Sequence, residues 1–138
     1  MKNIIGYLLA IYMFFVFKLT LIDRIPTANR RRMLLPFWEY RELLINTNHL
    51  YWCQQIGCNI LMLVPLGLLL PLLSKRFRKC YIIIFIGLLL SSFIEITQYF
   101  TCRGLCEFDD VFNNTFGAFI GYLLFKLIFT IRNNRHVS

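Results

Sequence analysis

The sequence predicts an all-α membrane protein, an integral membrane four-helix bundle with a long interfacial loop between its first and second helices. Of its 138 residues, 58% are hydrophobic and only 16% are charged, whereas a soluble domain is about 45–50% apolar and about 25% charged. Four apolar runs each have roughly the 20 residues that a helix needs to span a bilayer. We therefore expect a single membrane domain over residues 1–138.

The four apolar runs cover residues 3–22, 52–73, 80–100 and 110–131. The first contains Lys18 near its end, where a long side chain can reach the interface. No small-residue cleavage site precedes Asp23, so we expect this run to remain as a helix rather than to be removed as a signal peptide. The second contains Pro65, which we expect to kink the helix and to open a pocket toward the lipid.

The connections between these runs differ in length and charge. Residues 74–79 form a tight basic turn, and residues 101–109 form a short acidic turn. The long loop, residues 23–51, mixes arginines with aromatic residues that suit the headgroup layer, and we expect a short helix near 37–45. Four helices put both termini on the side of the basic turn, and its cluster of positive charge favours cytoplasmic termini.

Glu95 is a carboxylic acid inside the third predicted membrane helix. A charged side chain there costs about 2.5–3.5 kcal/mol and by default indicates function. Ser91 and Gln98 share its helix face, because residues three and four apart are neighbours on a helix. A buried carboxylate needs a hydrogen-bond donor, a proton or a positive charge. Arg103, in the acidic turn that follows, is the expected partner of Glu95.

The fourth run carries a matching stripe of polar and small residues, which are Asp110, Asn113 or Asn114, Gly117 and Gly121. Because a short turn makes the third and fourth helices neighbours, we expect the two stripes to face each other. The second helix brings Gln55 and Asn59 to the same rim of the bilayer. The predicted ligand-binding residues of this polar pocket are Asn59, Glu95, Gln98, Arg103, Asp109, Asp110, Asn113 and Asn114.

Other kinds of site find less support in the sequence. No nucleophile with a nearby base is evident, so no catalytic residue is predicted. Cys102 and Cys106 have a spacing that occurs in zinc sites, but no further ligand is evident, and we expect neither a metal nor a cofactor. The net charge of +8 lies in short runs beside apolar segments, as membrane-flanking charges do, so we expect no nucleic-acid partner.

Several motifs, taken in order, resemble the VanZ-like family of small bacterial membrane proteins. They are Leu35-Pro36-Phe37, Asn59, Pro65-Leu66-Gly67, Glu95-x-x-Gln98, Arg103, Asp109-Asp110, Asn113-Asn114-Thr115-x-Gly117 and Gly121-Tyr122. The resemblance covers about residues 30–125 and implies a multi-pass protein of the bacterial cell membrane. The best-known member confers low-level resistance to teicoplanin, so the resemblance implies a contribution of this chain to such resistance.

Three functions remain open from the sequence. In the first, a non-enzymatic membrane protein binds an envelope lipid, a cell-wall lipid or glycopolymer precursor, or a partner protein through the polar rim and the basic aromatic loop. In the second, an intramembrane enzyme acts on a lipid-linked phosphate, with Glu95, Asp109 and Asp110 holding a divalent ion and Arg103 holding the phosphate. In the third, a structural or partner subunit uses its polar residues only to form interhelical hydrogen bonds, each of which stabilises the bundle by about 0.6 kcal/mol.

Overall fold

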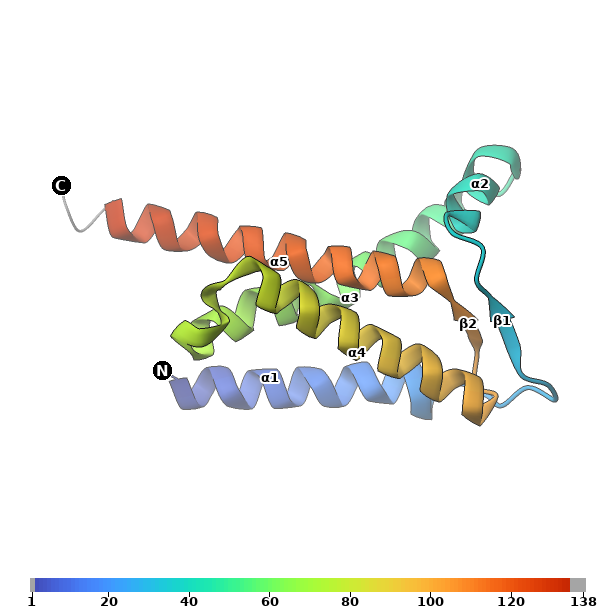
Figure 1. The fold of residues 1–138 in the computed structure, drawn as a ribbon, viewed down its shortest axis with the longest axis horizontal. Coiled ribbons are helices and arrows are strands. Elements are labelled where there is room, and N and C mark those ends of the chain that lie inside the picture. The colour runs from blue at the N-terminus through green and yellow to red at the C-terminus, as the bar shows by residue number, and fades with distance from the viewer. Residues whose placement is uncertain (1, 135–138) are drawn as a thin grey trace.

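The computed structural model describes residues 2–134, and the side chains of residues 2–132. Within this part of the chain, four long helices run side by side (Figure 1). They are α1 (Lys2–Phe17), which continues as the π-helical η1 (Lys18–Ile22), α3 (His49–Leu73), α4 (Cys80–Thr101) and α5 (Phe108–Asn134). Each is long and apolar enough to cross a membrane. The predicted all-α membrane bundle is therefore confirmed.

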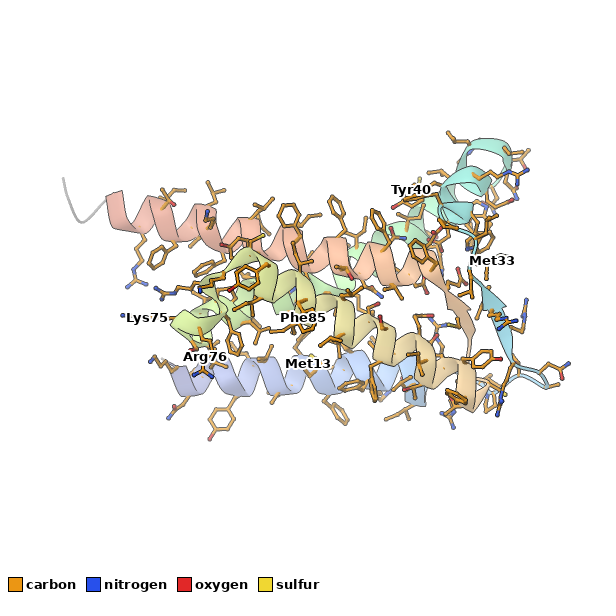
Figure 2. The ribbon with its side chains drawn as sticks, in the orientation of Figure 1. Met13, Met33, Tyr40, Lys75, Arg76 and Phe85 are labelled. Carbon is orange, nitrogen blue, oxygen red and sulfur yellow. The ribbon has the colours of Figure 1, made fainter. Side chains whose placement is uncertain are left out.

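The outer surface of the bundle is apolar over most of its length. Large hydrophobic side chains such as Phe14, Leu61, Phe85 and Leu127 point outward and are more than half exposed. In water such a surface would be unfavourable, but lipid tails are as apolar as these side chains. Figure 2 shows side chains projecting outward along the bundle between its two ends. The exposed apolar belt is what the composition predicted.

Helices α3 and α5 touch backbone to backbone. A Cβ atom on Gly117 would lie 1.8 Å from the carbonyl oxygen of Ile60, and one on Gly121 would lie 2.0 Å from that of Val64. Only glycine allows helices to approach so closely. The glycine half of the predicted stripe therefore faces α3, and the expectation that the whole stripe faces α4 is wrong. Its polar half reaches α4, where Ser91 contacts the side chain of Asn114 and the backbone of Asp110.

One end of the bundle is basic and the other is polar. Lys75 and Arg76, in the short helix η2 (Lys75–Arg78), lie at the same end as the start of α1 and the end of α5 (Figure 2). The polar end is covered by the long loop, which contains the short helix α2 (Trp38–Ile45) and the strand β1 (Arg31–Met33). The short helix expected near 37–45 is thus present.

The loop is attached to the bundle by a two-stranded parallel sheet that the sequence did not predict. Strand β1 pairs with β2 (Leu105–Glu107), with Arg31 opposite Leu105 and Met33 opposite Glu107. Figure 1 shows both strands at the polar end, next to α2. Strands of three residues are too short to produce a recognisable alternation of polar and apolar residues. The segment 101–109, predicted as a turn, therefore supplies part of this sheet.

Candidate functional site

Buried polar side chains gather at the polar end and come from five different elements. Those with less than a tenth of their surface exposed are Thr20, Glu39, Ser91, Glu95, Gln98, Glu107, Asp109, Asp110, Asn113 and Asn114. Six of the predicted site residues are in this set. Buried polar groups must find hydrogen-bond partners, so the partner of each one shows what it does for the structure.

Asp109 fixes helix α2 in place. One of its carboxylate oxygens accepts a hydrogen bond from the backbone N–H of Phe37 at 2.6 Å, and the other accepts one from the N–H of Glu39 at 2.9 Å. Phe37 lies just before α2 in the left-handed conformation, with φ of 59°, and has no capping side chain of its own. A carboxylate at a helix N-terminus satisfies free N–H groups and complements the helix dipole. Asp109 therefore acts as the cap of α2.

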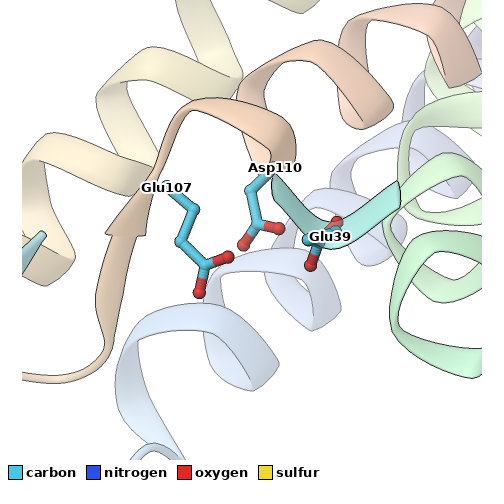
Figure 3. Close-up of side chains that lie close together, drawn as sticks. All are labelled: Glu39, Glu107 and Asp110. Atoms are coloured by element: carbon cyan, nitrogen blue, oxygen red, sulfur yellow. The ribbon is translucent and has the colours of Figure 1, made fainter. Parts of the chain in front are cut away.

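Three carboxylates converge at the start of α2 (Figure 3). Glu39, Glu107 and Asp110 each place a carboxylate oxygen within 4.8 Å of the others. Their hydrogen-bond donors are uncharged and are the indole of Trp38, the amide of Asn59 and the amide of Asn113. We refer to Glu39, Glu107 and Asp110 as the acidic triad.

The acidic triad concentrates negative charge where water is scarce. Burial raises the pKa of Glu39 to about 8, and the nearby carboxylates of Asp110, Glu107 and Asp109 add to the rise. Burial likewise raises the pKa of Glu107 to about 7, together with repulsion from Asp110. Both groups would be ionised at neutral pH in water. A bound cation or a proton at this place therefore stabilises the folded protein.

The polar residues of α4 connect the triad to the bundle. The Glu95 carboxylate accepts a hydrogen bond from the backbone N–H of Glu107 at 3.0 Å, and so holds β2 in position. The hydroxyl of Ser91 lies 3.5 Å from the carbonyl oxygen of Asp110. Gln98 donates to the carbonyl oxygen of Thr20 at 3.1 Å. The predicted polar face of α4 thus lies against α5, β2 and η1.

The predicted pair of Glu95 and Arg103 is wrong. Arg103 donates instead to the backbone carbonyl oxygens of Leu21 and Ile22, at 2.7 and 2.8 Å. These carbonyls belong to η1 at the end of the first membrane span, where the helix supplies no further N–H group for them. Between residues 2 and 132 the one ion pair joins Lys18 to Asp23, both partly exposed. Arg103 therefore secures a helix end.

The metal ligands considered in the enzyme hypothesis, Glu95, Asp109 and Asp110, do not converge either. Both oxygens of Asp109 are held by backbone N–H groups of the loop. Glu95 points to the backbone of β2. The structure brings Asp110 together with Glu39 and Glu107 instead, because the parallel sheet and the capped helix α2 place these two residues over the bundle.

Two cavities meet at Arg24. The first, which we call the groove, has a volume of about 450 Å³ and lies between α1 and α3, with lining residues that include Tyr12, Phe15, Leu61, Met62 and Pro65. The second, which we call the chamber, has a volume of about 480 Å³ and lies under α2. Its lining residues include Arg31, Trp38, Glu39, Trp52 and Glu107. Arg24 lines both cavities, and Asn59 lines the groove.

Pro65 borders the groove as expected, although α3 continues through it as one helix. Sequence reasoning missed Arg24, Glu39 and Glu107 as site residues, because it treated the long loop and the acidic turn as surface segments. Glu39 was an acidic residue inside a loop rich in arginine, which was the one available signal. Its position in the triad depends on a tertiary contact with Asp109 that no local pattern reveals.

Comparison with known proteins identifies the chain by family alone. A family model described as VanZ/LLP1 matches residues 4–129, which is nearly the whole chain. No curated protein and no solved structure matches the chain.

Proposed function

We propose that this chain, which belongs to the VanZ/LLP1 family, binds a phosphate-bearing envelope lipid in the bacterial cell membrane and lowers the sensitivity of the cell to teicoplanin. One observation carries this proposal: a single arginine, Arg24, lies where an apolar groove meets a polar chamber. Each cavity has a volume in the range typical of ligand sites, about 300–1,000 Å³. A ligand with a charged head and a hydrocarbon tail matches both cavities at once.

The chamber is suited to a phosphate headgroup. Arg24 and Arg31 both line it, and guanidinium groups bind phosphate through paired hydrogen bonds. Trp38 and Trp52 pack edge to face in its wall, with ring centroids 5.2 Å apart. Tryptophan is typical of the membrane–water interface, which is the depth at which a lipid headgroup lies. We therefore assign the headgroup to the chamber.

The groove is suited to an acyl or isoprenoid chain. Phe15 and Leu61 line it and are also more than half exposed on the outer surface of α1 and α3. A hydrocarbon chain can therefore enter sideways from the bilayer rather than through water. Asn59 lies at the polar end of the groove, where it also hydrogen-bonds Asp110. It connects the groove to the predicted site residues.

The proposed binding is non-enzymatic. The two buried hydroxyls at this end serve the structure, because Thr20 donates to the carbonyl oxygen of Val16 and Ser91 accepts from the amide of Asn114. The predicted site residues Gln98, Asp109, Asn113 and Asn114 support the walls through their hydrogen bonds. In this proposal Arg24 contacts the ligand and those side chains position the elements around it.

The orientation completes the proposal. The basic turn at η2 carries Lys75, Arg76 and Arg78 and is assigned to the cytoplasm by the positive-inside rule. The chamber at the opposite end then faces the outer surface, where teicoplanin acts. Sequestering or shielding a lipid-linked target there reduces the access of the drug.

Drug susceptibility tests the proposal in cells. A susceptible bacterium would express wild type, Arg24→Ala or Arg41→Ala, with membrane levels of each protein measured. Arg41 is a matched control, because it is an exposed arginine of α2 that lines neither cavity. We expect wild type and Arg41→Ala to raise the inhibitory concentration of teicoplanin and Arg24→Ala to leave it at the vector level. Equal protection by Arg24→Ala at equal membrane levels would refute the proposal.

A further inference from the structure

One oxygen of the acidic triad has no hydrogen-bond partner. Glu39 is fully buried, with 0% of its surface exposed, and its Oε1 atom contacts no donor in the described part of the chain. Its other oxygen accepts from the amide of Asn113 at 3.0 Å. A buried carboxylate oxygen left without a partner is strongly unfavourable. In Figure 3 the side chains of Glu107 and Asp110 reach toward this carboxylate.

No positive side chain neutralises the triad at ion-pair distance among residues 2–132. Its donors are two amides and an indole, all uncharged. Arg24 shares the chamber with Glu39 and Glu107 and is close enough to attract Glu107. The triad thus brings three carboxylates together next to a cavity, and one of their oxygens, Oε1 of Glu39, is buried without a hydrogen-bond partner.

We propose that Glu39, Glu107 and Asp110 bind one hard divalent cation, of the Mg²⁺ or Mn²⁺ type, at the wall of the chamber. A set of oxygen ligands alone is typical of sites for such hard cations, whereas protein sites for Zn²⁺ or Cu²⁺ usually include imidazole or thiolate ligands. Mg²⁺ is commonly held by a few carboxylates and completes its coordination with water and phosphate oxygens. This site replaces the expectation, drawn from the sequence, that the protein has no metal.

The cation deepens the proposed function. Bound at the triad, the cation lies at the wall of the chamber, which Glu39, Glu107 and Arg24 line. Together with Arg24 it provides two positive groups for one lipid phosphate. This second role rests on the proposed lipid binding, whereas the cation site itself rests on the triad alone. The cation also joins α2, β2 and α5, which each supply one ligand, so its binding should stabilise the covered end.

Binding of Mn²⁺ tests the site directly. The full-length protein would be purified in detergent, treated with EDTA and dialysed, and free Mn²⁺ would be measured by electron paramagnetic resonance during titration. We expect one saturable Mn²⁺ per chain, displaced by Mg²⁺. Glu39→Gln and Glu107→Gln should each weaken binding at least about tenfold. Glu42→Gln is the matched control on α2 and should bind as wild type does, because Glu42 is outside the triad.

Near-UV circular dichroism of Trp38 and Trp52 would establish that each variant is folded. If a triad variant fails to fold, the Mn²⁺ titration of wild type and the competition by Mg²⁺ test the cation site without that variant. Absence of a saturable Mn²⁺ site in wild type, or equal weakening by Glu42→Gln, would overturn the proposal. Wild type that binds Mn²⁺ but no lipid phosphate would refute the proposed function and support the cation site. Lipid binding without Mn²⁺ binding would refute the cation site alone.

Discussion

The carboxylate of Asp109 accepts a hydrogen bond from the backbone N–H of Glu39 at 2.9 Å, although the two residues are 70 positions apart in the sequence. This contact joins the start of the last membrane helix to the start of the short helix in the long loop. It places the Glu39 side chain over Asp110, the residue that follows Asp109. One capping interaction thus closes the polar end and assembles the acidic triad.

Replacing Asp109 should destabilise the covered end of the bundle. In Asp109→Ala the buried N–H groups of Phe37 and Glu39 lose their acceptor, and loss of a helix cap costs about 0.5–2 kcal/mol. We expect the free energy of unfolding, measured by denaturant titration in detergent, to fall by about 2 kcal/mol. Asp23→Ala removes an exposed ion pair and should change it by less than about 1 kcal/mol. Equal effects of both substitutions would contradict the capping role.

Adding one methyl group to Gly117 should separate α3 from α5. The new Cβ would lie 1.8 Å from the backbone oxygen of Ile60, which cannot move without displacing the helix. We expect Gly117→Ala to lower the thermal unfolding midpoint and the yield of folded protein. Gly57→Ala is the control in α3, because its Cβ would meet nothing within 4 Å and alanine is the better helix former. A Gly117→Ala protein as stable as wild type would contradict the close packing.

In the presence of EDTA, the protein should become less stable as the pH rises from 5 to 8.5. The pKa of Glu39 is raised to about 8 and that of Glu107 to about 7, from a reference of 4.5. The folded state therefore retains protons that the unfolded state has released, and raising the pH favours unfolding. The stability that these two protonated carboxyl groups contribute is complete below pH 4.5 and is lost as the pH rises through 7 and 8.

Thermal unfolding in EDTA at a series of pH values measures this dependence. Glu39→Gln cannot ionise and should flatten the upper part of the profile, while Glu42→Gln should leave the profile unchanged. A wild-type midpoint that rises between pH 5 and 8.5 would contradict the assignment of a raised pKa to these two carboxyl groups.

The helices could be predicted from the sequence because membrane spans depend on length and apolar character, both of which are local. The polar faces of α4 and α5 followed from helical periodicity in the same way, so Ser91, Glu95 and Asp110 were placed at the correct end. The glycines at 117 and 121 were placed in the stripe of polar and small residues, but their partner helix was not identified, because spacing within one helix does not identify its neighbour.

The covered end could not be predicted, because its structure depends on contacts between distant segments. The sheet of β1 and β2 involves only three residues on each side. Arg103 was assigned to Glu95 by proximity in the sequence and opposite charge, yet the backbone oxygens at the end of η1 are its actual partners. Glu39 belongs to the loop and reaches the site because Asp109 and the sheet hold the loop over the bundle.

The most direct test of the account is the binding of a lipid phosphate to the purified protein. Native mass spectrometry in detergent would compare polyprenyl phosphate, phosphatidylglycerol and uncharged diacylglycerol on wild type, Arg24→Ala and Arg41→Ala. We expect one phosphate-bearing lipid per wild-type or Arg41→Ala chain, no diacylglycerol, and at least about tenfold weaker binding to Arg24→Ala. Equal binding of phosphate-bearing lipid to Arg24→Ala and wild type would contradict the assignment of Arg24 as the point where headgroup and tail meet.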